Sequence, residues 1–219
     1  MIKTTIGFAL LATTFLSSAA SAFDITTDDL LEKLSNSPNV SWEEVGEDKK
    51  DETDVIAVNL PNDQTKYFRY TYSKPDGYEV ITKPELMLPT ITDPSEQNTY
   101  QTGGVAVNNP AGNKYGDITG KVFANNKVSG KLTGTSSYNN LYILGGAVYN
   151  AGEIGDITAD FINNSLTGTE EGSNSLYLRG GAIYNSDTGT IGNITGNFIG
   201  NYASKGAVYS VRDAAYGGA

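Results

Sequence analysis

Two short motifs recur along the sequence, and this repetition limits the folds open to the chain more than any other feature. The first motif occurs as "GGAVYN" at 145–150, "GGAIYN" at 180–185 and, in altered form, "KGAVYS" at 205–210. It alternates with "GDITGKVFANN" at 116–126, "GDITADFINN" at 155–164 and "GNITGNFIGN" at 192–201. Such repetition is typical of solenoids, in which a repeat buries its apolar side only by stacking on the next.

The spacing of the glycines predicts the size of the repeat. From Gly181 to Gly206 is 25 residues. The earlier intervals, counted from the Gly103-Gly104 pair, are longer because of insertions at 127–144 and 165–179. We therefore predict a unit of about 25 residues with inserted loops, which are candidate binding sites because solenoid insertions often gather on one face.

The second motif alternates as a β-strand does. In its middle copy, Ile157, Ala159 and Phe161 share one side and polar residues share the other. One extra residue between Ile118 and Phe123 in the first copy predicts a β-bulge. Glycines recur every few residues and would break a helix. These features indicate coils of a parallel β-helix, each strand pairing with its equivalent in the next coil.

The predicted fold is mainly β. It is a right-handed, single-stranded parallel β-helix of about four coils at 103–219, preceded by a small α+β segment at 23–102 that serves as a domain of its own or as the solenoid's cap. Equivalent residues of stacked coils form columns, in which buried amides can bond from coil to coil. The expected columns are Ile118, Ile157 and Ile194 inside, and Asn126, Asn164 and Asn201 at a turn.

Composition separates these two parts. Residues 23–102 carry 17 acidic and 7 basic residues, whereas 103–219 carry 8 and 7 and hold 22 of the 25 glycines. In the acidic part, "TTDDLLEKLSNS" at 26–37 predicts a short helix. The alternating "KYFRYTYS", the turn residues "KPDG" and the following "YEVIT" predict a β-hairpin over 67–82.

The first 22 residues have the pattern of a secretory signal. Lys3 provides the positive start, Ile6 to Leu16 an apolar core, and Ala20-Ser21-Ala22 a small-residue cleavage site. The apolar run is far shorter than the roughly 20 residues of a membrane helix. We expect a secreted chain that begins at Phe23.

The chain contains no Cys and no His. Zinc hydrolase sites and His-based triads are therefore excluded, and no catalytic residue, cofactor or metal site is predicted. A net charge of −10 without a basic patch argues against nucleic acid as a partner.

The two motifs also carry a family resemblance. "GGAV" and "GGAI", alternating with "FANN", "FINN" and "FIGN", resemble the GGA(I/L/V) and FxxN motifs of the chlamydial polymorphic membrane proteins and related autotransporter passengers. The resemblance covers 103–219. It implies a β-helical passenger on a Gram-negative surface, often an adhesin, followed by an outer-membrane barrel that would anchor it. That barrel is missing here, and the sequence ends on "GGA", so we expect the N-terminal piece of a longer protein.

Two sets of residues are candidates for chemistry. If Val148, Ile183 and Val208 point inward, then Tyr149, Tyr184 and Tyr209 stack outside as a contact surface for protein or glycan. The opposite parity, with the tyrosines packed under the inserted loops, stays open because Val107 stands where the first block would need a tyrosine.

The second candidate set is Asp117 and Asp156, with Asn193 next in their column. Two such carboxylates could hold a cation or act as an acid pair, whereas the simpler interpretation is a turn residue bonded to its own backbone.

From the sequence we expect a secreted, non-enzymatic, adhesin-like passenger that binds a host or matrix protein or glycan. Two alternatives remain: a carbohydrate-active β-helix enzyme and a purely structural surface stalk.

Overall fold

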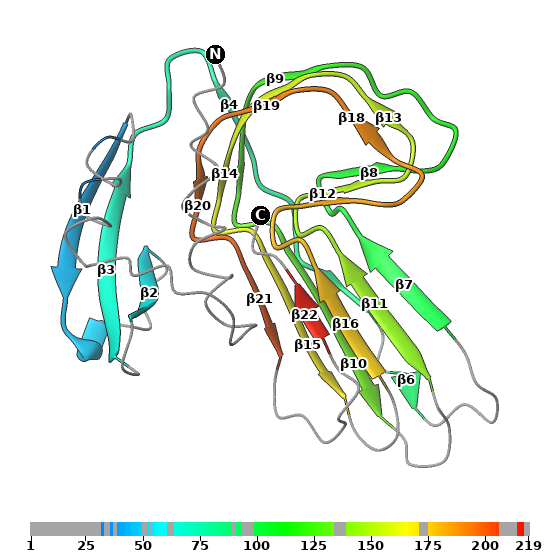
Figure 1. The fold of residues 1–219 in the computed structure, drawn as a ribbon, viewed down its shortest axis with the longest axis horizontal. Coiled ribbons are helices and arrows are strands. Elements are labelled where there is room, and N and C mark those ends of the chain that lie inside the picture. Colours follow the sequence, from blue (N-terminus) through cyan, green and yellow to red (C-terminus); the bar gives the residue numbers. More distant parts are fainter. Residues whose placement is uncertain are drawn as a thin grey trace.

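The computed structural model describes residues 32, 36, 39–49, 52, 54–60, 64–88, 91–92, 99–133, 139–170, 175–205 and 214–216. These residues form a small antiparallel sheet and, beside it, a stack of parallel coils (Figure 1). The predicted signal at 1–22 lies outside the described residues. Of the predicted helix at 26–37, only Glu32 and Asn36 are described, and the amide of Asn36 donates to the carbonyl of Glu32 at 3.1 Å.

The antiparallel sheet has the strand order β1-β3-β2. Its strands are β1 (Val40–Val45), β2 (Val55–Leu60) and β3 (Gln64–Tyr72), with a 3-10 turn η1 (Glu47–Lys49) after β1. The predicted alternation in β3 is confirmed, because Phe68 and Tyr70 are buried and Thr71 is exposed.

The predicted hairpin over 67–82 is wrong. A turn does form after Ser73, where Gly77 has a φ of 79° and the amide of Tyr78 donates to the carbonyl of Pro75. The next strand, β4 (Glu79–Ile81), nevertheless pairs parallel with β9 of the solenoid and not with β3. The turn therefore leads from the sheet into the first coil, and parallel pairing begins at Glu79.

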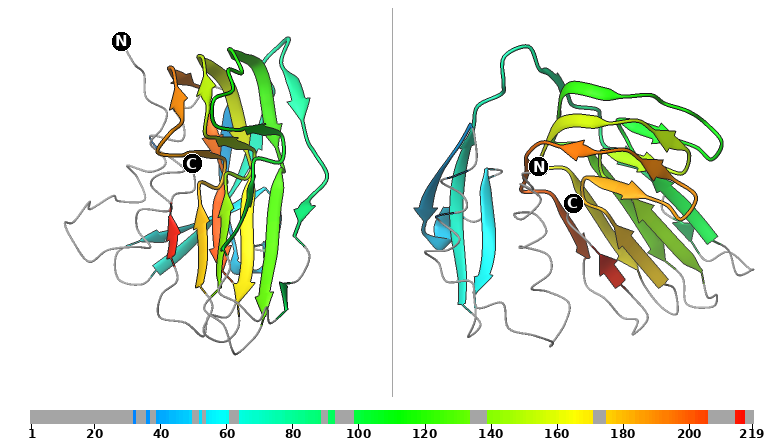
Figure 2. Two further views of the ribbon diagram at one scale, coloured as in Figure 1. Left: turned by 90° about the vertical axis from the view of Figure 1, so that its right-hand side faces the viewer. Right: turned by 45° about the horizontal axis from the view of Figure 1, so that its top comes forward.

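Each complete coil passes through the same series of walls, and Figure 2 shows the coils stacked in layers. The first wall is β4, β9 (Ile118–Ala124), β14 (Ile157–Ile162), and β19 (Ile194–Thr195) with β20 (Phe198–Ile199). The second is β5 (Leu86–Met87) with β6 (Ile91–Thr92), β10 (Lys127–Thr133), β15 (Ser165–Glu170) and β21 (Tyr202–Lys205). The third is β7 (Thr99–Gly103), β11 (Asn140–Leu144), β16 (Ser175–Arg179) and β22 (Ala214–Tyr216). The fourth is β8 (Val107–Asn109), β12 (Val148–Asn150) and β17 (Ile183–Asn185), and β13 (Glu153–Ile154) pairs with β18 (Thr190–Ile191) to close the coil.

This architecture confirms the predicted parallel β-helix, but the repeat unit is longer than 25 residues. Gly168 pairs with Lys205 and Tyr177 pairs with Ala214, so equivalent residues there are 37 positions apart. The predicted inserted loops at 127–144 and 165–179 supply β10, β11, β15 and β16, which are walls of the coil. Lys205 is equivalent to Gly168, so the 25-residue interval that the sequence suggests is not the period of the described strands.

Two buried clusters fill the interior, one in each arm of the coil. Walls that face each other across the interior supply the side chains of each cluster. In one arm the cluster contains Val107, Val148, Ile154, Ile157, Phe161 and Phe198. In the other arm the second and third walls face each other across Val128, Leu132, Leu166, Leu141, Ile143 and Leu178.

The FxxN motif forms the corner between the first and second walls. Its phenylalanines stack from coil to coil, with ring centroids 5.0 Å apart for Phe123 and Phe161 and 4.8 Å for Phe161 and Phe198. The residue before the final Asn has a left-handed backbone, which Asn and Gly tolerate best. These residues are Asn125, Asn163 and Gly200, with φ of 54°, 52° and 63°.

The final Asn of the motif forms the predicted amide ladder. Asn126 donates its side-chain amide to Asn164 Oδ1, and Asn164 donates to Asn201 Oδ1, both at 2.9 Å. All three side chains are buried. The bulge predicted in the first copy is also confirmed, since the register between β9 and β14 shifts after Thr158 and leaves Gly120 unpaired.

The antiparallel sheet packs on the side of the solenoid, against the outward face of the first wall. Phe68 and Tyr70 share a buried cluster with Val122, Ile162 and Ile199. The hydroxyl of Tyr72 donates to Asp160 Oδ2 and that of Tyr70 to Asn163 Oδ1. The sheet therefore covers a lateral wall and does not close an end of the coil stack.

Candidate functional site

The strand pairing of the "GGAxYN" motif shows which of its side chains point into the core. Val148 pairs with Ile183 and with Val107 of the coil before. Val148 is fully buried in the core, so Tyr149, the next residue, points outward. Asn108, and not Val107, stands opposite Tyr149. The predicted match of Gly103-Gly104 with Gly145-Gly146 is therefore wrong by one position, because Gly145 corresponds to Gly104.

Two of the three predicted tyrosines form an outward stack. The ring centroids of Tyr149 and Tyr184 are 5.9 Å apart, with an angle of 19° between the ring planes. Both side chains are half-buried. Tyr209 lies outside the described residues. Equivalent residues in the neighbouring strands are 37 positions apart, whereas Tyr209 follows Tyr184 by only 25 positions, so the two are not sequence equivalents.

A second outward tyrosine stack lies on the third wall. Tyr142 and Tyr177 pair in register between β11 and β16, with centroids 4.6 Å apart and planes 12° apart. They alternate with Leu141, Ile143, Leu176 and Leu178, all of which are fully buried. The sequence signal for this stack is the pair "LYIL" and "LYLR", which the 25-residue unit predicts to lie in inserted loops.

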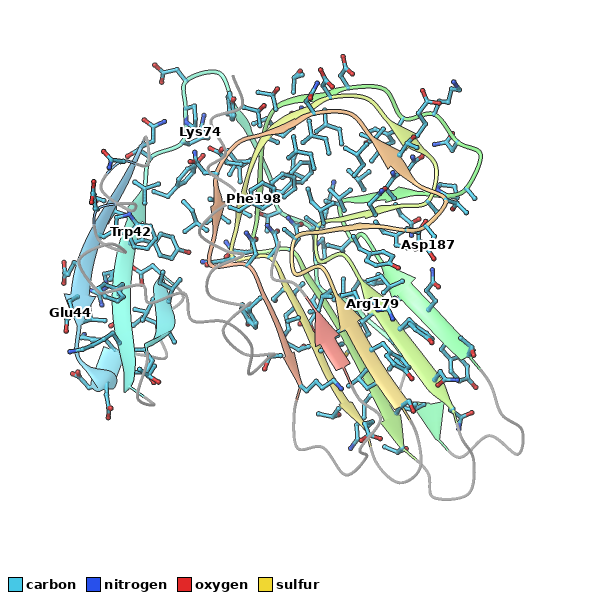
Figure 3. The ribbon with its side chains drawn as sticks, viewed as in Figure 1. Trp42, Glu44, Lys74, Arg179, Asp187 and Phe198 are labelled. Atoms are coloured by element: carbon cyan, nitrogen blue, oxygen red, sulfur yellow. The ribbon has the colours of Figure 1, made fainter. Side chains whose placement is uncertain are left out.

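The two stacks converge at the glycine corner between the third and fourth walls. Gln101, directly below Tyr142 in the outward column, donates its amide to the hydroxyl of Tyr149 at 2.9 Å. Arg179, at the end of β16, has its guanidinium carbon 5.8 Å from the centroid of Tyr142 and 5.9 Å from that of Tyr177 (Figure 3). We call the surface of these six residues the tyrosine face: Gln101, Tyr142, Tyr149, Tyr177, Arg179 and Tyr184.

Glycines make this corner possible. Gly104, Gly145 and Gly180 have φ of 63°, 68° and 73°, a region that other residues rarely adopt. A Cβ on Gly146 would strike the carbonyl oxygen of Gly181 in the next coil. The glycine pair thus lets two successive coils approach closely and brings the third and fourth walls together at an angle.

The carboxylates singled out in the sequence serve the backbone. Asp117 Oδ1 accepts the amide of Asp156 at 2.9 Å, and Asp156 Oδ1 accepts the amide of Asn193 at 2.8 Å. The expected bond of each side chain to its own backbone is therefore replaced by a bond to the backbone of the next coil. Within the described ranges, no group of three or more Asp or Glu is placed to hold a metal ion.

A buried carboxylate that the sequence analysis did not single out is Asp160. Its Oδ1 accepts the backbone and side-chain amides of Asn197, at 2.7 and 3.1 Å. Its Oδ2 accepts the hydroxyl of Tyr72. Burial, together with this hydrogen bond to the carboxylate, raises the pKa of Tyr72 above its usual range. Asp160 therefore joins two coils to each other and to the antiparallel sheet.

One hollow of about 530 Å³ lies on the outward face of the second wall. Its lining combines serine and threonine hydroxyls with two lysines, two glycines, a leucine and an exposed methionine. The lining residues include Met87, Ser129, Lys131, Thr167, Ser204 and Lys205.

The comparisons with known proteins add no relative. No family model matches the sequence, and neither a curated protein nor a solved structure gives a significant match. Among the described residues, no helix has the length and apolar character needed to cross a membrane.

Proposed function

We propose that this protein is a secreted, surface-displayed, adhesin-like solenoid that binds a host or matrix molecule through its tyrosine face. The observation that carries the proposal is the convergence of two outward tyrosine stacks at one corner, linked by the hydrogen bond from Gln101 to Tyr149. Tyrosine and arginine are the residues most enriched at energetically important interface positions.

The remaining support comes from the sequence. The first 22 residues have the signal-peptide pattern, and the motifs resemble those of autotransporter passengers. A parallel β-helix suits display because each coil adds the same outward columns. Asp117, Asp156 and Asp160 are used in inter-coil hydrogen bonds, and no described feature favours the enzyme alternative over binding.

The proposal is tested by a double substitution, Tyr149→Ser with Tyr184→Ser, in the full chain. Retention is measured on mucin, on extracellular-matrix gel and on cultured epithelial cells. The matched control is Tyr115→Ser with Tyr202→Ser, since these two tyrosines are exposed elsewhere. We expect the first pair to weaken retention by about tenfold or more, as for truncated interface tyrosines. Equal retention by both double variants and the unaltered chain would reject the tyrosine face as the binding surface.

A further inference from the structure

The tyrosine face differs in charge from the acidic chain that carries it. The protein has a net charge of −10. In the described strands of the third and fourth walls, however, the outward positions hold no Asp or Glu, and Arg179 is the only charged residue among them.

The stacking of the rings decides which atoms a ligand meets. In each pair the ring faces are turned toward the partner in the next coil, at 4.6 Å for Tyr142 and Tyr177. A ligand on this surface therefore meets ring edges and hydroxyl groups. Ring edges carry partial positive charge, and phenol hydroxyls donate hydrogen bonds. Both features favour anionic oxygen atoms.

Arg179 adds a cation beside the same rings. Its guanidinium lies alongside both members of the Tyr142–Tyr177 stack. A guanidinium presents a planar fork of donors that matches a carboxylate or a sulfate group. Arg179 corresponds to Leu144 in the coil before, so the charge occurs at one level of the stack and not in every coil.

The shape of the face favours a polymer over a small anion. Two stacks span two coils, and equivalent groups on neighbouring coils are about 4.8 Å apart. A linear sugar chain lying along the stacking direction has a residue length of the same order and could place its acid groups and hydroxyls over successive levels. The amides of Gln101 and Asn108 and the hydroxyl of Thr99 continue the polar surface toward the first coil.

We infer that the tyrosine face binds a linear polysaccharide that bears carboxylate or sulfate groups, with Arg179 contacting one of those groups. This inference rests on the proposed function and names its ligand class. Because the whole chain is acidic, its net charge repels a polyanion, and measurable binding reports a local site.

The test uses the full chain and two matched pairs of polymers. Polygalacturonate is compared with its methyl ester, and dextran sulfate with dextran, by titration calorimetry. We expect binding to the charged member of at least one pair and none to its neutral partner. Stronger binding of polygalacturonate than of its methyl ester indicates recognition of carboxylate groups, and stronger binding of dextran sulfate than of dextran indicates recognition of sulfate groups. Equal binding to charged and neutral members overturns the inference.

Single substitutions locate the site. Arg179→Gln should weaken binding by about tenfold, the usual scale for one charge-assisted contact. Arg179→Lys keeps the charge without the planar fork and should show a smaller loss. Lys114→Gln changes the net charge equally at an exposed ion pair with Glu153, outside the tyrosine face, and should leave binding unchanged. Far-UV circular dichroism checks that each variant is folded.

Three further results would overturn the inference. Loss of binding in Lys131→Gln, with Arg179→Gln unaffected, places the polyanion in the hollow of the second wall. Binding of poly-glutamate as tightly as the polysaccharides makes an acidic peptide the ligand. Tyrosine-dependent retention on mucin or matrix, with no binding of any charged polysaccharide, leaves the proposed function standing and removes the acidic glycan.

Discussion

At the scale of single residues, the asparagines at the corners carry much of the fold's specificity. Asn164 donates to the carbonyl of Phe123 at 2.8 Å and to Asn201, and it accepts the backbone and side-chain amides of Asn126. One buried side chain thus satisfies groups in three coils. Leaving buried donors and acceptors unpaired costs about 1–3 kcal/mol each.

We therefore predict that Asn164→Ala lowers the free energy of unfolding by about 3 kcal/mol or more, because several buried groups lose their partner at once. Urea unfolding followed by circular dichroism measures the change. Asn108→Ala removes an exposed amide of the same kind and should alter stability by only about 0.5 kcal/mol. If the two substitutions cost the same, the ladder contributes no special stability.

The hydroxyl of Tyr72 makes the free energy of unfolding decrease at alkaline pH. Its pKa is raised in the folded chain by burial and by the hydrogen bond to Asp160. The contribution is present below the unfolded tyrosine pKa of about 10 and is lost as the pH rises further, because only the unfolded state then gives up its proton. Burial likewise raises the pKa of Tyr70, which acts in the same direction.

We expect the free energy of unfolding to fall between pH 9 and pH 11 in the unaltered chain, and to fall less steeply in Tyr72→Phe. Tyr115→Phe is the control, since Tyr115 is exposed in the turn before β9. Parallel pH profiles for Tyr72→Phe and the unaltered chain would contradict the role given to this hydroxyl.

At the scale of elements, much could be predicted from the sequence because the repeated motifs lie at corners. The stacked phenylalanines, the amide ladder of Asn126, Asn164 and Asn201, and the bulge at Gly120 all follow from motif spacing and alternation. The second and third walls did not follow, because the 25-residue interval to Gly206 suggests a shorter coil, and 127–144 and 165–179 then exceed that length and are interpreted as insertions.

The pairing of β4 could not be predicted for a different reason. Tyr78 to Thr82 follows a good turn and alternates no less well than β3, so local sequence favours a hairpin. Parallel pairing with β9 wins because Ile81 lies in register with Phe123 and packs against the buried cluster of the first wall, whereas Val80, opposite Val122, stays half-exposed. Such long-range pairing leaves no local trace in the sequence.

The antiparallel sheet is attached to the solenoid by apolar contacts that can be tested. The protein has a single tryptophan, Trp42, which packs against Tyr70 with ring centroids 5.7 Å apart and borders the cluster that includes Ile162. We predict that Ile162→Asp separates the sheet from the solenoid, since a charge buried there has no partner. Trp42 fluorescence should then shift to longer wavelength.

The matched control is Val80→Asp, because Val80 is half-exposed on β4. It should leave the emission of Trp42 unchanged. An unaltered emission spectrum in Ile162→Asp would show that the sheet does not depend on this contact.

At the scale of the whole molecule, one stack of coils builds two different lateral surfaces. The outward face of the first wall is covered by the antiparallel sheet through the cluster of Phe68, Tyr70 and Ile162. The outward faces of the third and fourth walls carry the tyrosine face, without carboxylates in their described strands. The candidate site was half predicted: the stack of Tyr149 and Tyr184 followed from the motif, whereas Arg179 and the second stack required the true period of the coil.

Binding through the tyrosine face is tested by tyrosine nitration mapped by mass spectrometry. The full chain is nitrated with and without bound mucin or matrix. We predict that Tyr142, Tyr149, Tyr177 and Tyr184 are protected in the bound state while Tyr115 and Tyr202 react equally in both. Unchanged nitration of the four tyrosines, or protection confined to the other two, would contradict it.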